Sequence, residues 1–215
     1  MNTDLQKTLF WIGHASFYIK TGSGTIFIDP FNIGDSIMDR ADLILITHAH
    51  YDHCNKADIK KVMKPDAEIY APSGCLEGDF KNKTVTAPGF STDWKGIKIG
   101  CIPAYNNKPD RINFHPRANN WVGYIIDIGG FNIYHAGDTD FIDEMKQLKN
   151  IGAGLLPMGG KYVMDVDEMI TAARTINPVY VVPMHYKRLL EDNGVAAETK
   201  LKKELKNALV MREVQ

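Results

Sequence analysis

The feature that most constrains the fold of this chain is a dense group of metal-ligand residues that directly follows an apolar run. The apolar run is Leu43–Ile46, and the group after it reads THAHYDH, from Thr47 to His53. Three imidazoles and one carboxylate within six residues are not expected of a plain surface loop, and both groups are common ligands of transition metals. The sequence therefore predicts a strand whose end presents a metal site.

The spacing within this group favours two adjacent ions. Alternate residues of an extended chain point the same way, so His48 and His50 are expected to reach one ion together. Asp52 and His53 follow at the turn into a predicted helix that Asn55 can cap, where they can face a second ion beside the first. The loop after the strand thus predicts a centre of one or two metal ions.

Two later segments repeat the arrangement of a ligand residue at the end of a strand. The segment YHAGDT places Asp138 in a glycine-containing turn, and PMHY places His185 after another apolar run. Residues at strand ends are held by the sheet, which fixes the geometry of a site. Asp138 and His185 are therefore candidate ligands of the same centre.

Short β-rich runs and amphipathic helices alternate in both halves of the chain. This alternation, without a low-complexity linker, predicts one α/β domain over residues 1–215 in which two packed sheets carry helices outside. The predicted strands are Thr8–Ile12, Phe17–Lys20, Thr25–Asp29, Leu43–Thr47, Ile69–Ala71, Ile97–Ile102, Tyr124–Ile128, Asn132–His135, Val179–Met184 and Val210–Val214. The predicted helices run from Asn55 to Pro65, start near Asp140, run from Asp165 to about Ile176, and occupy a Lys-rich segment with Leu201, Leu205 and Leu209 on one face.

The bulk composition argues against several classes of function. A net charge of -1 on 215 residues makes binding to nucleic acid or anionic lipid unlikely. The apolar runs are too short to cross a bilayer, and the N-terminal segment lacks the pattern of a secretory signal. Cys54, Cys75 and Cys101 are odd in number and widely spaced, which does not suggest a disulfide framework. We expect a cytoplasmic protein without membrane insertion, and a homo-oligomer is compatible with the sequence.

The order of these motifs resembles that of a known family. HxHxDH after a strand, then GDT, then a strand-terminal histidine, is similar to the metallo-β-lactamase-fold hydrolases. The fragments WIGHASF at 11–17, IFIDPF at 26–31 and IPAYN at 102–106 agree with the branch that contains ascorbate-6-phosphate lactonase and N-acyl-phosphatidylethanolamine phospholipase D. The resemblance covers nearly the whole chain and implies a four-layer αββα sandwich of two packed mixed sheets with helices outside.

The resemblance also implies a role for each candidate ligand. It implies a first ion on two histidines, a second ion on three side chains, and a carboxylate that bridges the two ions. Asp29, in the turn IDP, resembles a buried aspartate that braces the histidine loop from behind. The implied ligands are His48 and His50 for the first ion, Asp52, His53 and His185 for the second, and Asp138 for the bridge.

One departure from the family pattern concerns the first ion. The family usually supplies a third imidazole from the loop after the strand that ends here at Ala104, where this chain reads Tyr105-Asn106. Either Asn106 donates a carbonyl oxygen, or His115, nine residues further on, folds back into the site. His115 is also, with Asp52, a candidate catalytic residue. His14, in Gly13-His14-Ala15, is either a hydrogen-bonded structural group or a support for the ligands.

These observations predict metal-assisted hydrolysis. One or two ions lower the pKa of a water molecule, and Asp52 is expected to hold that water and accept its proton. Zinc suits the imidazoles, and manganese is the alternative because of the carboxylates. Two rival functions remain: a nuclease or RNA-processing enzyme of the same fold, and a metal-binding protein without hydrolytic turnover.

Basic residues near the motifs predict the charge of the substrate. Cations that converge near a metal cleft bind phosphate or carboxylate groups, so a small anionic ester, lactone or phosphodiester is the expected substrate. At least two of these basic side chains are expected to point into the cleft. They are Lys108, Arg111, Arg117, Lys161, Lys187 and Arg188.

Overall fold

The strands pair into two sheets in the computed structural model, which describes residues 5–76, 78 and 80–214. Residues 1–4, 77, 79 and 215 of the predicted domain lie outside this range, and with them part of the N-terminal segment that was searched for a signal. Each sheet has six strands in chain order, antiparallel toward one edge and parallel toward the other. The first sheet holds β1 (Leu9–Gly13), β2 (Ser16–Thr21), β3 (Gly24–Ile28), β4 (Ala41–Leu45), β5 (Met63–Pro72) and β6 (Lys83–Thr86). The second holds β7 (Ser91–Trp94), β8 (Ile97–Pro103), β9 (Val122–Ile128), β10 (Phe131–His135), β11 (Ile151–Pro157) and β12 (Tyr180–Met184).

Apolar side chains fill the space between the two sheets and the space under the first helix layer. Leu43 and Leu45 of β4 pack into the larger cluster, which draws side chains from both sheets. Ile44 and Ile46 point the other way and pack into a second cluster with residues of α2 (Lys56–Val62). Both faces of this strand are buried, which explains why the run Leu43–Ile46 is apolar without interruption. Each fully buried side chain of this kind contributes about 1.5–3 kcal/mol.

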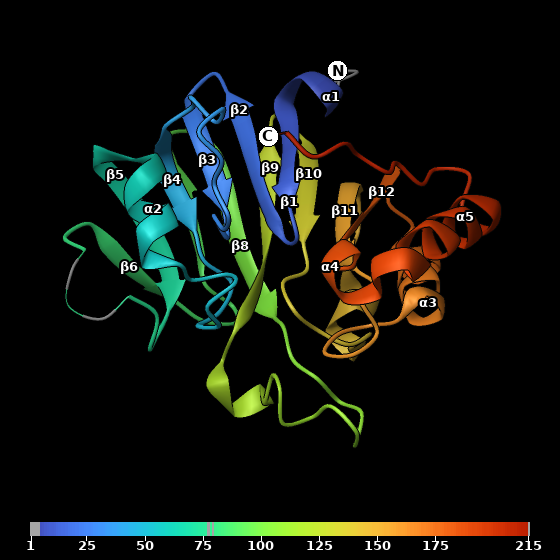
Figure 1. Ribbon diagram of the computed structural model, residues 1–215. Coiled ribbons are helices and arrows are strands. Elements are labelled where there is room, and N and C mark those ends of the chain that lie inside the picture. Colours follow the sequence, from blue (N-terminus) through green and yellow to red (C-terminus); the bar gives the residue numbers. More distant parts are fainter. Residues whose placement is uncertain (1–4, 77, 79, 215) are drawn as a thin grey trace.

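Helices cover the outer faces of the two sheets (Figure 1). α2 lies against the first sheet, and α3 (Val166–Ile176) and α5 (Gly194–Glu204) lie on the side of the second. The predicted αββα layering is therefore confirmed. No helix in the described ranges is long and apolar enough to span a bilayer. The shorter helical elements are α1 (Leu5–Thr8), η1 (Arg117–Asn119), η2 (Asp143–Gln147), α4 (Lys187–Leu190) and η3 (Glu191–Asn193).

Local signals in the sequence are confirmed where they involve caps and turns. Asp165 accepts from the N–H of Glu168, whose side chain accepts from the N–H of Asp165, and this capping box starts α3. Asn55 caps α2 through the N–H groups of the first turn. The hairpin between β9 and β10 turns at Gly129 and Gly130, which both have positive φ.

The helix predicted to start near Asp140 is present only as a short 3-10 turn, and Asp140 itself is not helical. The backbone N–H of Asp140 donates to the carbonyl of Tyr105 at 3.0 Å, and its carboxylate accepts from the N–H groups of Asn107 and Lys108. These bonds tie Asp140 to the loop after β8 and leave no helical turn there. The 3-10 turn η2 begins three residues later, at Asp143.

The predicted Lys-rich helix is present as α5 but is shorter than predicted, and the predicted C-terminal strand is absent from the described residues. The Lys-rich helix α5 ends at Glu204, Leu205 is extended, and the N–H of Leu209 donates to the carbonyl of Val181 beside β12. The segment predicted as the strand Val210–Val214 forms no strand within the described residues, and it meets β1 through an isolated bridge from Glu213 to Trp11. Pairing with β12 therefore replaces the last helical turn.

Three strands carry signals too weak to be predicted. β6 and β7 have four residues each and lie at sheet edges, where few side chains are buried. β11 reads IGAGLLP, in which two glycines and a proline mask a strand that is buried at every position. In the second sheet it pairs with both β10 and β12, so it helps to place the ends that carry Asp138 and His185.

Candidate metal centre

Asp29 holds the histidine loop at the end of β4. Its Oδ1 accepts from the N–H of Thr47 at 2.8 Å, and its Oδ2 accepts from the Thr47 hydroxyl at 2.6 Å and from His53 Nδ1 at 2.8 Å. Asp29 is fully buried and has φ +46, a backbone conformation that is unfavourable for a non-glycine residue. This geometry matches the bracing role that the family resemblance implies.

His48 and His50 turn two ring nitrogens toward each other. The Thr47 hydroxyl donates to Asp29, so it accepts from His48 Nδ1 at 2.9 Å, which leaves His48 Nε2 with a lone pair. That Nε2 lies 3.1 Å from His50 Nδ1. Burial lowers the pKa of His48 well below the usual value for histidine, so its ring is neutral near pH 7. Either a proton on His50 Nδ1 or a cation can satisfy the lone pair of His48 Nε2.

His115 folds back into this cluster from the long loop after β8. Its Nδ1 lies 2.7 Å from Asn106 Oδ1, and the Asn106 amide nitrogen donates to Asp140 Oδ1 at 3.1 Å and to the Tyr162 carbonyl at 3.0 Å. Because the Asn106 oxygen is engaged by His115, it is not free to be a ligand. Of the two alternatives, the structure therefore brings His115 to the place of the third imidazole. The ligand atoms of His48, His50 and His115 lie within 4.8 Å of one another.

Asp138 lies between this cluster and a second one. Its Oδ2 is 3.3 Å from His115 Nε2, 4.0 Å from His48 Nε2 and 2.9 Å from His185 Nε2. Its Oδ1 is 3.4 Å from His53 Nε2. Burial raises the pKa of this carboxyl, but the surrounding imidazoles outweigh burial and hold the pKa well below its usual value. Asp138 is thus an anion placed where it can contact two ions.

The second cluster consists of His14, Asp52, His53 and His185, whose ligand atoms also lie within 4.8 Å of one another. His14 Nε2 is 3.0 Å from Asp52 Oδ2, and the rings of His14 and His185 are 3.9 Å apart. Burial lowers the pKa of His14 to about 4, against the opposing effect of its hydrogen bond to Asp52. Burial raises the pKa of Asp52, but His14 and His53 outweigh it, so the carboxyl stays ionised. His14 thus contacts Asp52 and is also near enough to this cluster to be a ligand.

Buried polar atoms without partners test whether a metal fits here. Among the described residues, His53 Nε2, His115 Nε2 and Asp138 Oδ1 are buried and form no hydrogen bond. Such atoms destabilise a fold by about 1–3 kcal/mol each when nothing satisfies them. All three face the space between the two clusters, and their chemistry is that of zinc or manganese ligands. The residues therefore fit a metal centre.

Close packing joins the histidine loop to the turn that carries Asp138. The N–H of Val122 donates to the carbonyl of Thr47 at 3.1 Å, which links the first half of the chain to the second. Gly137 has φ +66, and a Cβ there would lie 3.0 Å from the Val122 carbonyl oxygen and 3.2 Å from Thr47 Cβ. The glycine of the GDT motif is needed because no side chain fits between the two loops.

A cavity of about 250 Å³ opens over the centre. Its polar lining includes Asp52, Asp138 and His185, and two aromatic side chains, Phe114 and Tyr162, form part of its wall with ring centroids 4.7 Å apart. The sequence analysis did not single out these two aromatic residues. They lie on irregular loops and show no periodic pattern, so only the folded loops bring them to the site.

Comparison with known proteins places the chain in a family. Residues 8–185 match the model described as the beta-lactamase superfamily domain. A UPF0173 metal-dependent hydrolase of Thermoplasma volcanium is 34% identical over 191 residues, which cover 83% of this chain and 82% of that protein. The corresponding hydrolase of Thermococcus onnurineus is 36% identical over 190 residues, which cover 82% of this chain and 83% of the relative. The chain belongs to the UPF0173 metal-dependent hydrolases of the metallo-β-lactamase superfamily.

Solved structures agree with this assignment. A crystal structure from Parabacteroides distasonis superimposes with a TM-score of 0.85 at 34% identity and covers 96% of this chain and 93% of its own. A metallo hydrolase of Ignicoccus hospitalis superimposes with a TM-score of 0.75 and covers 97% and 96% of the two chains. Its 24% identity supports the shared fold alone.

In this UPF0173 hydrolase, four of the six predicted substrate-facing cations pair with carboxylates. Arg111 is buried with its Nε 2.7 Å from Asp140 and its guanidinium 2.5 Å from Glu168, which Lys108 also contacts. These two cations fasten the His115 loop and do not line the cavity over the centre. Arg117 pairs with Glu144, Lys187 with Glu213, Lys161 lies over the ring of Tyr162, and Arg188 lies over the ring of Phe31.

Proposed function

We propose that this hydrolase cleaves a small anionic ester, lactone or phosphodiester at a centre of one or two zinc ions. The observation that carries the proposal is the pair of ligand clusters that meet at Asp138, with buried ring nitrogens that have no other partner. A purely structural histidine cluster would satisfy these atoms with protein hydrogen bonds. A metal centre beneath a small cavity explains both the burial and the missing partners.

The clusters suggest which residues would hold each ion. The first ion would use three imidazoles and the second a carboxylate and two imidazoles, with Asp138 shared between them. Zinc suits this excess of imidazole, and manganese is the alternative because two carboxylates take part. The proposed ligands are His48, His50 and His115 for the first ion, and Asp52, His53 and His185 for the second.

The metal, when bound, lowers the pKa of a water molecule toward neutrality and polarises the oxygen of the bond to be cleaved. The protein contributes the orientation of the ligands. Asp29 fixes the tautomer of His53, and Asn106 fixes that of His115, because each accepts the proton of the Nδ1 atom. His14 holds the Asp52 carboxylate from the opposite side at 3.0 Å. These bonds set the ligand geometry before substrate arrives.

Asp52 is the residue we propose as proton acceptor. Its side chain is 36% exposed, lines the cavity over the centre and stays ionised, so one face of the carboxylate is available to a water molecule. A positioned carboxylate orients the attacking water and takes its proton, and general base help of this kind contributes about 10²–10⁴-fold to the rate. His115, the other candidate catalytic residue, is buried and suits the role of ligand better.

Two features support the proposed class of substrate. The cavity of about 250 Å³ suits a small molecule, and its wall at Phe114 and Tyr162 is aromatic. The motif resemblance to the branch with ascorbate-6-phosphate lactonase and N-acyl-phosphatidylethanolamine phospholipase D favours lactones and phosphodiesters within that class.

The test is metal analysis of protein purified without chelator or nickel resin, followed by turnover assays. Zinc and manganese forms would each be offered a panel of lactones, carboxylic esters, phosphodiesters and single-stranded RNA. We expect lactone or phosphodiester turnover that chelation removes and added metal restores. Turnover of RNA alone would favour the nuclease alternative. Tight metal binding with no turnover on any of the four classes would favour a binding protein.

A further inference from the structure

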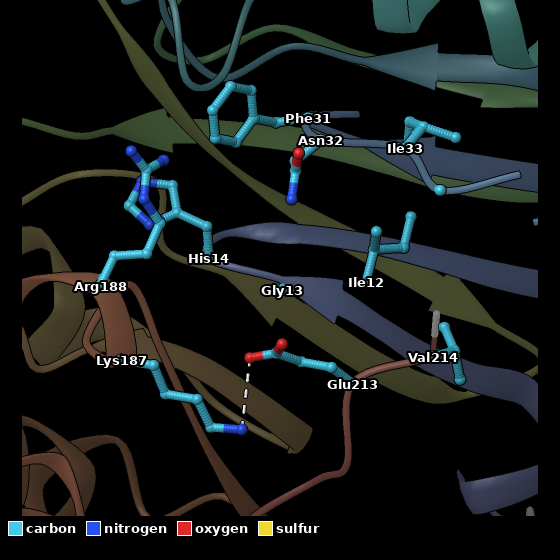
Figure 2. Close-up of a pocket in the computed structure, with 11 residues that line it drawn as sticks. Ile12, Gly13, His14, Phe31, Asn32, Ile33, Lys187, Arg188, Glu213 and Val214 are labelled. Atoms are coloured by element: carbon cyan, nitrogen blue, oxygen red, sulfur yellow. Dashed lines mark ion pairs between the residues drawn. The ribbon is translucent and has the colours of Figure 1, made fainter. Parts of the chain in front are cut away.

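A second cavity, of about 380 Å³, lies beside the metal centre (Figure 2). It is formed by the turn after β1, the loop after β3, the start of α4 and the C-terminal segment. In Figure 2 the side chain of Asn32 points into this space, and those of Arg188 and Glu213 border it. The residues that matter for its chemistry are His14, Phe31, Asn32, Lys187, Arg188 and Glu213.

The cavity has one positive charge that no acidic group balances. Glu213 is paired with Lys187 at 3.2 Å, and the Lys187 ammonium also lies over the ring of Trp11, so this pair is internally neutral. Arg188 has its guanidinium 5.3 Å from the ring centroid of Phe31. Across the residues that the structure describes, no carboxylate lies within ion-pair distance of Arg188. An anion in the cavity would therefore meet an uncompensated guanidinium.

A single imidazole connects this cavity to the metal centre. His14 lines the second cavity, while its Nε2 lies 3.0 Å from Asp52 Oδ2 and its ring lies 3.9 Å from the ring of His185. Asp52 and His185 line the first cavity. Arg188 itself follows His185 by three residues. The second cavity and the candidate metal centre therefore adjoin at His14.

We infer that Arg188 binds an anionic group of the substrate, a phosphate or a carboxylate, at a distance from the bond that is cleaved. The planar guanidinium presents parallel N–H donors that match two oxygens of such a group. Phe31 lies against one face of the guanidinium, and the amide of Asn32, the next residue in the chain, adds a donor that points into the cavity. This inference rests on the proposed hydrolase function and specifies part of its substrate.

The experiment compares one lactone in three forms: neutral, with a distal carboxylate, and with a distal phosphate. The variants are Arg188→Gln, which removes the charge, Arg188→Lys, which keeps it, and the control Arg174→Gln. Arg174 lies on α3 and pairs with Glu204 at the surface. We expect Arg188→Gln to raise the KM of a charged form about tenfold, the effect of one charge-assisted hydrogen bond, with kcat unchanged. The KM of the neutral form should not change, and Arg188→Lys should recover part of the loss.

Two outcomes would overturn the inference. One is an unchanged KM for both charged forms in Arg188→Gln, and the other is an equal rise for the neutral form, which would indicate a structural disturbance. The comparison of carboxylate and phosphate forms shows which anion the site prefers.

A binding measurement separates this inference from the proposed function. Calorimetric titration of the metal-loaded protein with inorganic phosphate should show about tenfold weaker affinity in Arg188→Gln than in Arg174→Gln. If no lactone is hydrolysed, the proposed function fails, yet this titration still decides whether Arg188 binds an anion. Equal affinity in the two variants would refute the anion site.

Discussion

The two halves of the sandwich contribute to the candidate metal centre in different ways. The first half places its ligands in one loop, Thr47–His53, which β4 and Asp29 hold from below. The second half contributes His115, Asp138 and His185 from three loops, after β8, β10 and β12. Ligands that are adjacent in sequence can be predicted from the sequence alone. Ligands that are far apart in sequence come together only through the order of the strands. The same candidate centre thus combines one short sequence motif with three loops that only the order of the strands brings together.

The largest expected effect concerns Asp52 in the local cluster. Asp52→Asn keeps the size of the side chain but removes the anionic oxygen, so turnover should fall by about 10²–10⁴-fold while the fold persists. Hydrolysis and thermal melting would be measured at equal metal loading, with Asp35→Asn, an exposed carboxylate paired with Lys61, as the control. Activity within about threefold of the parent would show that Asp52 takes no part in the chemistry.

The number of metal ions bound per chain tests the role of His115, one of the proposed ligands from the second half of the sandwich. His115→Gln should remove the first ion and leave the second, so that metal content falls from two ions per chain to one. Asn106→Leu keeps the imidazole but removes the oxygen that orients it, and should weaken that ion by about 10–100-fold. Competition with a chromogenic chelator measures both the metal content and the metal affinity of each variant. Two equally tight ions in His115→Gln would mean that another residue completes the first cluster.

Stability tests how the His115 loop is held. Arg111→Met leaves Asp140 and Glu168 without their buried cation, which should cost about 3–5 kcal/mol and lower the melting temperature by about 10 °C. The exposed pair of Arg117 and Glu144 is the control, since Arg117→Met should cost less than about 1 kcal/mol. Calorimetry and hydrogen exchange should locate the loosening at residues 104–121. Faster hydrogen exchange at residues 47–53 instead would contradict the view that the His115 loop and the histidine loop are held independently.

Acid titration of chelator-treated protein tests how the local cluster is held without metal. Burial lowers the pKa of His14 from 6.5 to about 4, so below pH 6.5 the unfolded chain binds a proton that the folded chain excludes. The stability contributed by this group is complete above pH 6.5 and is lost, by up to about 3 kcal/mol, as the pH falls toward 4. His14→Asn removes this titration and tolerates the positive φ of the site. Melting curves at pH 7, 6 and 5 should therefore diverge between the two proteins, and parallel curves would contradict the account.

The histidine loop Thr47–His53 could be predicted from the sequence because its residues are adjacent in the chain. The apolar run before Thr47 and the density of imidazoles define the loop without any knowledge of strand order. Asp138 and His185 were accessible for a related reason, since each follows a run that reads as a strand. The two sheets followed from the alternation of elements, and only strands with few buried or few β-forming residues, such as β6 and β11, escaped notice.

The position of His115 could not be derived in this way. Nothing between Asn106 and His115 is periodic, and the course of this loop depends on Arg111 reaching Asp140 and Glu168 from distant elements. Bonds from Asp140 to Tyr105, Asn107 and Lys108, which are also distant in sequence, keep Asp140 out of the predicted helix. The C-terminal errors have the same origin, because Leu209 leaves its helix to pair with Val181. Contacts between segments far apart in sequence overrode local propensity in each case.

The dispersion of the ligands also bears on how the protein is made. The ligand residues span the chain from His48 to His185, so a chain that is synthesised from its N-terminus has its histidine loop long before His185 emerges. During that interval the loop lacks the other proposed ligands, which lie later in the chain. The proposed ligands of the first ion are complete once His115 has emerged, whereas the second ion also needs His185, which reaches Asp138 when β12 pairs with β11. We therefore expect the second ion to be gained after the first, when folding is nearly complete.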